Sequence, residues 1–346
     1  MSTHAPIAAP SQAPAADALR GMWDYVRESG LRVLVLGPSK DFNAKITMLL
    51  VSAERGRPLL ALKLPTTPLA ERAVEAEVRV LRELDGLPHE VRRTVPRVVD
   101  LVEFEGRTAV VMTAVPGTPM TTSYLDWRHT RSAARIGADF AAVGEWLAHF
   151  QGSTMSKAQP VAMDAGVTSR LRSRFSGEQE LDSDLERLTR VHRRLGHSQT
   201  PRTFVHGDLW CGNLLLDGGR VTGAVDWEYG STCGEPVRDL VRFPLMYALY
   251  LDRRTRSGRR VAGHTGFVAD SWGAGVAYAL DGRGWFPELF RRFLQEGLTR
   301  LGASPERWRD AALAGIAEAA ALTDDEAFAR CNLVLFRRLS QIENAT

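Results

Sequence analysis

The chain has 346 residues, of which 44% are hydrophobic and 25% are charged, a composition ordinary for a soluble globular protein. Its 44 lysines and arginines nearly balance its 41 aspartates and glutamates, and the resulting net charge of +3 argues against a nucleic-acid partner. The same balance gives no sign of an acidic pocket for a polycationic ligand. No apolar run approaches the length of a membrane span, so we expect no membrane partner.

Three cysteines, Cys211, Cys233 and Cys331, form neither a Cys-x-x-Cys pair nor an even set. This pattern indicates a reducing, cytoplasmic setting and no structural metal site. Residues 1–16 are rich in Ala, Pro and Ser and lack the basic start and apolar stretch of a signal peptide. We expect them to form a disordered tail.

The N-terminal third of the chain predicts a small antiparallel sheet with helices beside it. Apolar periodicity predicts helices at residues 17–29 and 68–85. Short apolar runs bounded by turn residues predict strands. The predicted strands are residues 31–36, 44–52, 59–64 and 108–115.

The remainder of the chain is predicted to be mainly helical. Helical periodicity recurs from residue 131 to the C-terminal end, interrupted near residues 204–228. The predicted helices are residues 131–151, part of 177–195, 263–281, 284–302, 304–322 and 324–341.

Residues 204–228, where the helical periodicity is interrupted, contain the most informative residues of the chain. Asp208 and Asn213 lie five positions apart in a segment too tight to be helical. Two short apolar runs follow, joined by Asp217-Gly218-Gly219, which is a strong turn signal and predicts a hairpin. The second run should place Asp226 beside Asp208 and Asn213.

Two carboxylates and one carboxamide in this order suit phosphoryl transfer. Asp208 would orient and deprotonate an attacking hydroxyl, while Asn213 and Asp226 would hold a magnesium ion that neutralises the nucleotide phosphates. The alternative interpretation is a polar-capped hairpin with Asp226 at an ordinary strand end. The occurrence of all three residues together favours the kinase site.

The segments His206-Gly207-Asp208-Leu209 with Asn213, and Asp226-Trp227-Glu228, resemble the aminoglycoside phosphotransferase family, which includes choline-kinase-like and other small-molecule kinases. The resemblance implies an α+β, bilobal protein-kinase-like fold, with an N-terminal antiparallel sheet and one helix, and a larger, mainly helical C-terminal lobe. We expect the lobes at residues 17–115 and 116–346. The resemblance also implies ATP and Mg²⁺ as cofactors.

Lys63 is one of only four lysines and lies at the end of an apolar strand, where an unpaired ammonium group is costly. The resemblance implies that it reaches the α- and β-phosphates, and the alternative is an edge-strand lysine that extends to solvent. A carboxylate must hold it in place. In the family pattern this glutamate precedes a Leu-x-x-Leu ending, which fits Glu77 best and Glu75 second.

The resemblance also implies nucleotide contacts from the backbone. The carbonyl of Thr113 and the amide of Val115 would bond the adenine edge, although a plain core strand with a turn fits the same residues. Amides near Ser39 are expected to cap the phosphates. This segment departs from a glycine-rich loop, because Gly37 is its one glycine and Pro38 removes a donor, so an ordinary turn is the alternative.

Two residues are expected to support the segment that carries Asp208 and Asn213, called the catalytic loop below. His206 would brace the loop through backbone hydrogen bonds rather than transfer protons. Asp239 matches the aspartate that buttresses this loop in the family, and its alternative role is that of an ordinary charge at a helix N-terminus.

The acceptor is left open by these residues. The family implies the hydroxyl of a small molecule, such as an aminoglycoside, another antibiotic, a sugar or an amino alcohol. An alternative is a kinase for Ser or Thr of a peptide in natural-product biosynthesis, with the basic run Arg253–Arg260 as an anion-binding patch rather than a solvated loop. A third hypothesis is a nucleotide-binding regulator without catalysis. No oligomeric state is indicated.

Overall fold

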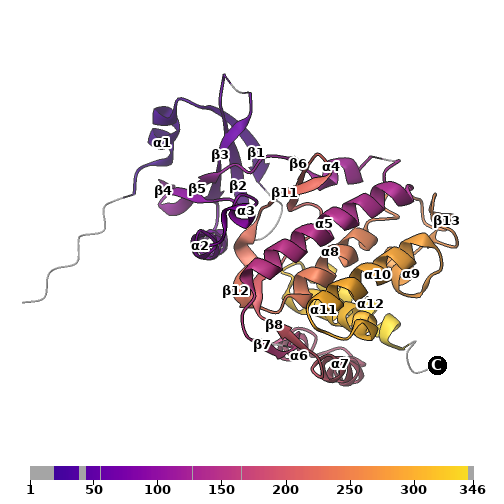
Figure 1. The fold of residues 1–346 in the computed structure, drawn as a ribbon. Coiled ribbons are helices and arrows are strands. Elements are labelled where there is room, and N and C mark those ends of the chain that lie inside the picture. The colour runs from indigo at the N-terminus through magenta and orange to yellow at the C-terminus, as the bar shows by residue number, and fades with distance from the viewer. Residues whose placement is uncertain (1–18, 39–43, 55, 127, 165, 342–346) are drawn as a thin grey trace, which may run out of the picture.

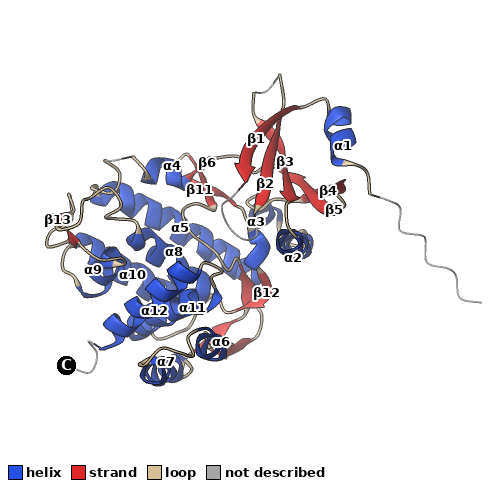
Figure 2. Cartoon of the chain, turned by 180° about the vertical axis from the view of Figure 1, so that it is seen from behind, coloured by secondary structure: helices blue, strands red, loops and turns tan. Residues whose placement is uncertain are grey.

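The computed structural model describes residues 19–38, 44–54, 56–126, 128–164 and 166–341. A small N-terminal lobe built on one antiparallel sheet sits against a larger, mainly helical C-terminal lobe (Figure 1). Figure 2 shows the same division from behind, with most helices gathered in the larger lobe. The predicted α+β, two-lobed fold is confirmed.

The N-terminal sheet has five strands in the order β1-β2-β3-β5-β4, all antiparallel. The register pairs Lys63 with Thr47 on one side and with Val110 on the other, so Lys63 lies on the central strand. The interpretation of Lys63 as an edge-strand lysine is therefore wrong. The strands are β1 (Arg32–Pro38), β2 (Lys45–Val51), β3 (Pro58–Pro65), β4 (Val98–Phe104) and β5 (Arg107–Thr113).

Alternation along the strands divides the sheet residues between two cores. Leu62 and Leu64 belong to the small core that also contains Met22 of helix α1 (Met22–Ser29). Val110 and Met112 belong to the large core on the opposite face, which includes the buried side of helix α2 (Pro68–Leu84). Side chains alternate along a strand, and the two neighbours of Lys63, Leu62 and Leu64, point into the small core. The side chain of Lys63 therefore points to the opposite face of the sheet, toward α2.

The four strands and two helices predicted in the N-terminal lobe are present in the described residues, and β4 is a fifth strand that was not among them. Of the helix predicted at residues 17–29, the structure shows α1, while the tail expected at residues 1–16 lies outside the described part. Helix α2 begins where expected because Thr67 caps it, its hydroxyl accepting a hydrogen bond from the amide of Ala70 at 3.1 Å. A short helix, α3 (His89–Arg92), precedes β4. The lobe boundary at residue 115 stays a prediction.

The C-terminal lobe contains the predicted helices with one correction. The helix predicted at residues 263–281 begins only at Ala274, because Gly263, Gly266 and Gly273 adopt left-handed backbone angles that end helical geometry. The helices are α4 (Met120–Tyr124), α5 (Ala133–Thr154), α6 (Val167–Arg174), α7 (Leu181–Leu195), α8 (Val237–Leu249), α9 (Ala274–Asp281), α10 (Trp285–Arg300), α11 (Trp308–Leu322) and α12 (Glu326–Gln341), with 3-10 turns η1 (Trp227–Tyr229) and η2 (Pro305–Arg307).

The predicted hairpin after Asn213 is confirmed. Strand β10 (Leu214–Asp217) pairs with β11 (Arg220–Ala224) in antiparallel register, and Gly218 and Gly219 in the turn both have positive φ angles, as such tight turns require. Strand β10 also pairs with β6 (Thr118–Pro119), which joins the hairpin to the chain just beyond β5. The smaller strands are β6 (Thr118–Pro119), β7 (Ala158–Pro160), β8 (Gln199–Pro201), β9 (Thr203–Val205), β10 (Leu214–Asp217), β11 (Arg220–Ala224), β12 (Ser231–Gly234), β13 (Arg259–Arg260) and β14 (Val268–Ala269).

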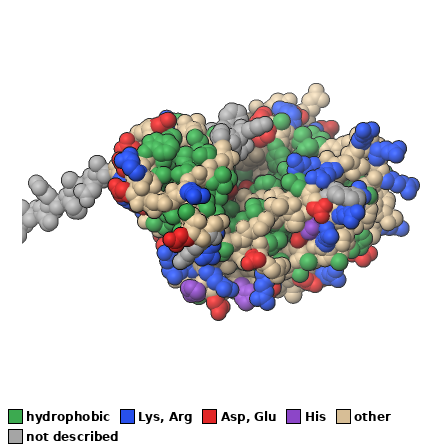
Figure 3. Space-filling model, turned by 90° about the horizontal axis from the view of Figure 1, so that it is seen from above, with side chains coloured by type: hydrophobic (Ala, Val, Ile, Leu, Met, Phe, Trp, Pro, Cys, Tyr) green, Lys and Arg blue, Asp and Glu red, His purple; other side chains and the backbone are tan. Residues whose placement is uncertain are grey.

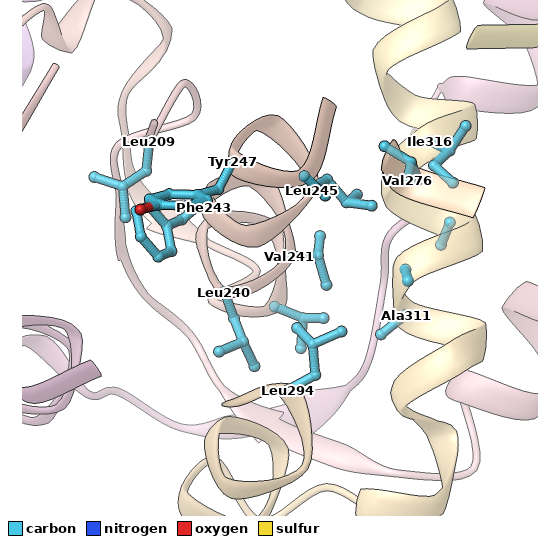
Figure 4. Packing of buried hydrophobic residues seen from close by; sticks show 14 of the residues in the cluster. Leu209, Leu240, Val241, Phe243, Leu245, Tyr247, Val276, Leu294, Ala311 and Ile316 are labelled. Atoms are coloured by element: carbon cyan, nitrogen blue, oxygen red, sulfur yellow. The ribbon is translucent and has the colours of Figure 1, made fainter. Parts of the chain in front are cut away.

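Helix α8 lies at the centre of the C-terminal core. Figure 4 shows Phe243 and Tyr247 of this helix beside Leu209 of the catalytic loop, while Val241 faces α11 across the core. Leu240 packs toward α10 on another side of the helix. The helix is therefore held on several sides and offers a rigid base for the loop above it. In the part of the chain that the structure describes, no helix combines the length and apolar character of a membrane span.

Candidate active site

The loop between β9 and β10 carries Asp208 and Asn213, and local hydrogen bonds hold it in a closed turn. The amide nitrogen of the Asn213 side chain donates to the backbone oxygen of Asp208 at 2.9 Å and to its carboxylate at 3.2 Å. The amide of Val225 donates to the Asn213 carbonyl at 2.9 Å, which fixes the end of β11 to this loop. The structure thus brings Asp208, Asn213 and Asp226 into one small region.

Gly207 allows this turn to form. Its φ angle is 82°, a left-handed conformation that side chains disfavour. A Cβ at this position would lie 2.2 Å from the carbonyl oxygen of Tyr229, a contact too short for any side chain. The glycine in His206-Gly207-Asp208 is therefore required by both backbone conformation and space.

Asp226 occupies an unusual backbone conformation. Its φ of 67° and ψ of 63° lie in the left-handed region, which costs energy for a residue with a side chain. Its carboxylate forms an ion pair with Lys63, and the nearby ammonium lowers the pKa of Asp226. The side chain is still 44% exposed, so it stays accessible to a ligand.

Lys63 and Glu77 form a buried ion pair between β3 and α2. The Lys63 ammonium donates to both carboxylate oxygens of Glu77 at 2.6 Å. Glu77 is fully buried, and its carboxylate also accepts a hydrogen bond from the backbone amide of Trp227 at 3.1 Å. It therefore links the sheet to the segment after Asp226. Burial alone would lower the pKa of Lys63, but the carboxylates of Asp226 and Glu77 raise it above its usual value. Glu75, the second candidate, is exposed.

His206 and Asp239 hold the backbone of the loop. The amides of His206 and Gly207 donate to the two carboxylate oxygens of Asp239 at 2.7 and 2.9 Å. The His206 ring pairs with the carbonyl of Val225 at 2.8 Å, which again joins the loop to the residue that follows β11. Burial raises the pKa of Asp239, while these hydrogen bonds and the histidine act in the opposite direction.

The oxygen atoms of Asn213 and Asp226 fit a magnesium ion. Because the Asn213 side-chain nitrogen donates to Asp208, its side-chain oxygen is left available for a cation. Magnesium prefers oxygen ligands and is often held by one or two protein groups together with substrate phosphates. Within the described ranges no cluster of three or more His, Cys, Asp or Glu residues could hold a metal by itself.

The expected backbone contacts to adenine lie at the end of β5. Thr113 pairs with Leu60 of β3, and the amide of Ala114 donates to the carbonyl of Leu59 at 2.9 Å. The amide of Val115 bonds to no backbone carbonyl of the described residues. Ser39 lies outside the described residues, so the phosphate-capping role expected near it stays a prediction.

Two residues that sequence reasoning did not select also reach the site. Lys45 of β2 forms an ion pair with Glu228, and both side chains are only 11% exposed. Arg242 of α8 donates to Oδ1 of Asp208 through Nη2 at 2.7 Å and through Nε at 3.1 Å. Neither residue lies in a motif, and the scarcity of lysine was the one available signal for Lys45.

A pocket of about 360 Å³ opens beside Asp208, between the catalytic loop, η1, α8 and the end of α11. Seen from above in Figure 3, the molecule is hollowed between its two lobes. Two arginines of α8, Arg238 and Arg242, line this pocket. Its acidic lining residues are Asp208, Glu228, Glu318, Asp324 and Asp325.

The lining of this pocket is more acidic than the balanced composition suggested. Arg238 pairs with Glu318 at 3.3 Å, and Arg242 pairs with Asp208, so both arginines are matched by carboxylates. Burial raises the pKa of Glu318 to about 7, although Arg238 and Arg242 favour its ionised form. Asp324 and Asp325 add negative charge at the rim.

The chain is similar to known phosphotransferases in sequence and in fold. A family model described as the phosphotransferase enzyme family matches residues 47–271. The apo form of a thermostable mutant of aminoglycoside phosphotransferase APH(4)-Ia is similar in structure, with a TM-score of 0.57 and 13% identity over 93% of this chain and 99% of that chain. ADP-bound aminoglycoside phosphotransferase APH(2'')-Ib has a TM-score of 0.54 and 14% identity over 92% and 96% of the two chains. A search of curated proteins found no significant match.

At these identities the solved structures establish the fold alone. The family model covers more than half of the chain, and its matched region includes Lys63, the catalytic loop and Asp226. The chain therefore belongs to the phosphotransferase enzyme family and is a kinase-type phosphotransferase.

Proposed function

We propose that the protein transfers the γ-phosphoryl group of ATP to a hydroxyl of a small, positively charged molecule. The observation that carries this proposal is the acidic pocket next to Asp208. It has room for a small molecule. Asp208 and Glu318 pair with the two arginines and Glu228 pairs with Lys45, which leaves the carboxylates of Asp324 and Asp325 as the negative charge at its rim. A cationic acceptor would be attracted to such a lining.

In this proposal the residues act by position and charge. Asp208 accepts the proton of the acceptor hydroxyl, and Lys63, held by Glu77, binds the α- and β-phosphates. Asn213 and Asp226 would hold the magnesium ion, which neutralises charge on the phosphates when it is bound. Lys63 pairs with Asp226 in the structure, so nucleotide binding would exchange one anionic partner of Lys63 for the phosphates.

Supporting residues keep this arrangement in place. Asp239 and His206 hold the backbone of the catalytic loop, while Thr113 and Val115 would contact the adenine. No covalent enzyme intermediate is needed, because alignment of the two substrates and neutralisation of charge suffice for this class of reaction.

The acceptor class is supported by the solved relatives. A thermostable mutant of APH(4)-Ia was solved in a ternary complex with AMP-PNP and hygromycin B, and APH(2'')-IIa was solved with gentamicin. Those acceptors are bound by those proteins. The acidic pocket makes the same chemical class the first choice here, and it disfavours the peptide hypothesis, which depended on a basic acceptor groove.

The test is mass spectrometry of acceptors incubated with the protein, ATP and Mg²⁺. The panel contains aminoglycosides, neutral sugars, amino alcohols and Ser/Thr peptides, and Asp208→Asn serves as the catalytic control. We expect one phosphoryl group on a cationic acceptor, and no gain with the variant. Phosphorylation of peptides or neutral sugars in preference to every cationic acceptor would overturn the proposed acceptor class.

A further inference from the structure

Helix α8 holds the catalytic loop at two points three residues apart. The carboxylate of Asp239 accepts hydrogen bonds from the backbone amides of His206 and Gly207. The guanidinium of Arg242 donates to the side chain of Asp208. Residues three apart on a helix lie on one face, so this face of α8 is turned toward the loop. The first contact fixes the backbone of the loop, and the second fixes the carboxylate that it carries.

The two oxygens of the Asp208 carboxylate are held differently. Oδ1 accepts both hydrogen bonds from Arg242, whereas Oδ2 accepts one from the residues that the structure describes, donated by the side-chain nitrogen of Asn213 at 3.2 Å. Each carboxylate oxygen can accept about two hydrogen bonds. Oδ1 is therefore saturated, and Oδ2 retains one lone pair for a further donor.

We propose that Arg242 is a positioning residue of the transfer reaction, which orients the Asp208 carboxylate so that Oδ2 receives the acceptor hydroxyl. This inference rests on the proposed function. Nε and Nη2 of the planar guanidinium both bind Oδ1, so this oxygen is held from two directions. Because the loop backbone fixes the start of the Asp208 side chain, holding Oδ1 also restricts rotation of the carboxylate and keeps Oδ2 in one place. Lysine at this position would supply the charge without the fork.

The surroundings of Arg242 support a fixed position. Its neighbours in sequence, Val241 and Phe243, are fully buried in the core that Figure 4 shows, so the backbone from which it extends is rigid. The side chains of Arg242 and Asp208 are each 26% exposed, and both line the acceptor pocket. The pair therefore lies where the acceptor hydroxyl must arrive.

The experiment compares Arg242→Met and Arg242→Lys with wild-type protein, in the full chain. Turnover is measured with Mg²⁺, ATP and the acceptor that gains phosphate in the mixed panel, and ADP affinity is measured separately by quenching of tryptophan fluorescence. We expect Arg242→Met to lower kcat about 100-fold, within the range that general base catalysis contributes, while the KM for ATP and the ADP affinity change less than about twofold. Arg242→Lys should recover part of the lost kcat.

Two further variants make the test specific. Arg292→Met removes an exposed arginine of α10 by the same substitution and should leave turnover unchanged. In the double variant Asp208→Asn with Arg242→Met, the rate should equal that of Asp208→Asn alone, since Arg242 acts through Asp208.

Several results would overturn the inference. These are a kcat of Arg242→Met within about threefold of wild type, a further 100-fold loss in the double variant, or a loss of ADP affinity and thermal stability that parallels the loss of kcat. A wild-type protein that phosphorylates no acceptor would overturn the proposed function and this inference together, which distinguishes that failure from the other three.

Discussion

Lys45 in the N-terminal lobe forms an ion pair with Glu228 in the C-terminal lobe, and both side chains are almost fully removed from solvent. Lys45 lies at the start of β2, while Glu228 is two residues beyond Asp226. A second contact between the lobes, from Lys63 to Asp226, lies near it. The two lysines therefore connect the sheet to both acidic residues of the Asp-Trp-Glu segment.

The pair between Lys45 and Glu228 should stabilise the fold measurably. Removing one partner from a mostly buried pair leaves the other charge poorly solvated. We expect Lys45→Met and Glu228→Gln to destabilise the protein singly, with a coupling free energy of about 1–3 kcal/mol in the double-mutant cycle. Urea unfolding of the four proteins measures this coupling, and fully additive effects would contradict it.

Nucleotide binding should depend on Lys63 and Glu77 but not on Glu75. We expect Lys63→Met to reduce kcat/KM for ATP by about 100-fold or more, because the cation proposed to bind the phosphates is lost. Glu77→Gln should cause a smaller loss, since Lys63 keeps its charge and loses its fixed position. Glu75→Gln is the matched control, because Glu75 is exposed on the same helix two residues earlier. An equal loss in Glu75→Gln and Glu77→Gln would refute the assignment.

Glu318 should make stability depend on pH. Its pKa is raised to about 7 in the folded protein by burial, so the folded state binds its proton more tightly than the unfolded chain does. The contribution of Glu318 to stability is thus fully present below about pH 4.3 and is lost as pH rises through about 7, by about 4 kcal/mol in all.

The measurement is urea unfolding at pH 5 and pH 8. The stability of wild-type protein relative to Glu318→Gln should be lower at pH 8 than at pH 5, because only the wild type must ionise a buried carboxyl group. A difference that does not change with pH would show that Glu318 titrates normally.

Gly207 should be intolerant of a side chain. Gly207→Ala combines a left-handed backbone with a clash against the Tyr229 carbonyl, and we expect a loss of more than about 2 kcal/mol in unfolding free energy together with loss of activity. Gly218→Ala is the matched control, because Gly218 also has a positive φ but no atom would lie within 4 Å of its Cβ. That variant should lose about 1 kcal/mol and retain activity. Equal effects would show that the clash is unimportant.

The sequence alone determined the elements whose signals are local. The turn residues Asp217-Gly218-Gly219 predicted the hairpin that carries Asp226 back toward Asn213, and the structure shows this pairing. Helical periodicity predicted α2, α5, α7, α10, α11 and α12 to within a few residues. The start of α9 was missed because backbone angles at three glycines ended a pattern that looked periodic.

Tertiary structure decided the relationships between distant segments. The acidic pocket is assembled from residues between Gly207 and Asp325, so a balanced total charge could not reveal it. Lys63 could be placed on the central strand only when β5 was found between β3 and β4. Arg242 and Asp208 are 34 positions apart and meet because α8 packs beneath the catalytic loop. Motifs can be recognised in the sequence because their residues are close together along the chain. The residues of a pocket are distant along the chain, so their charges come together only when the core packs.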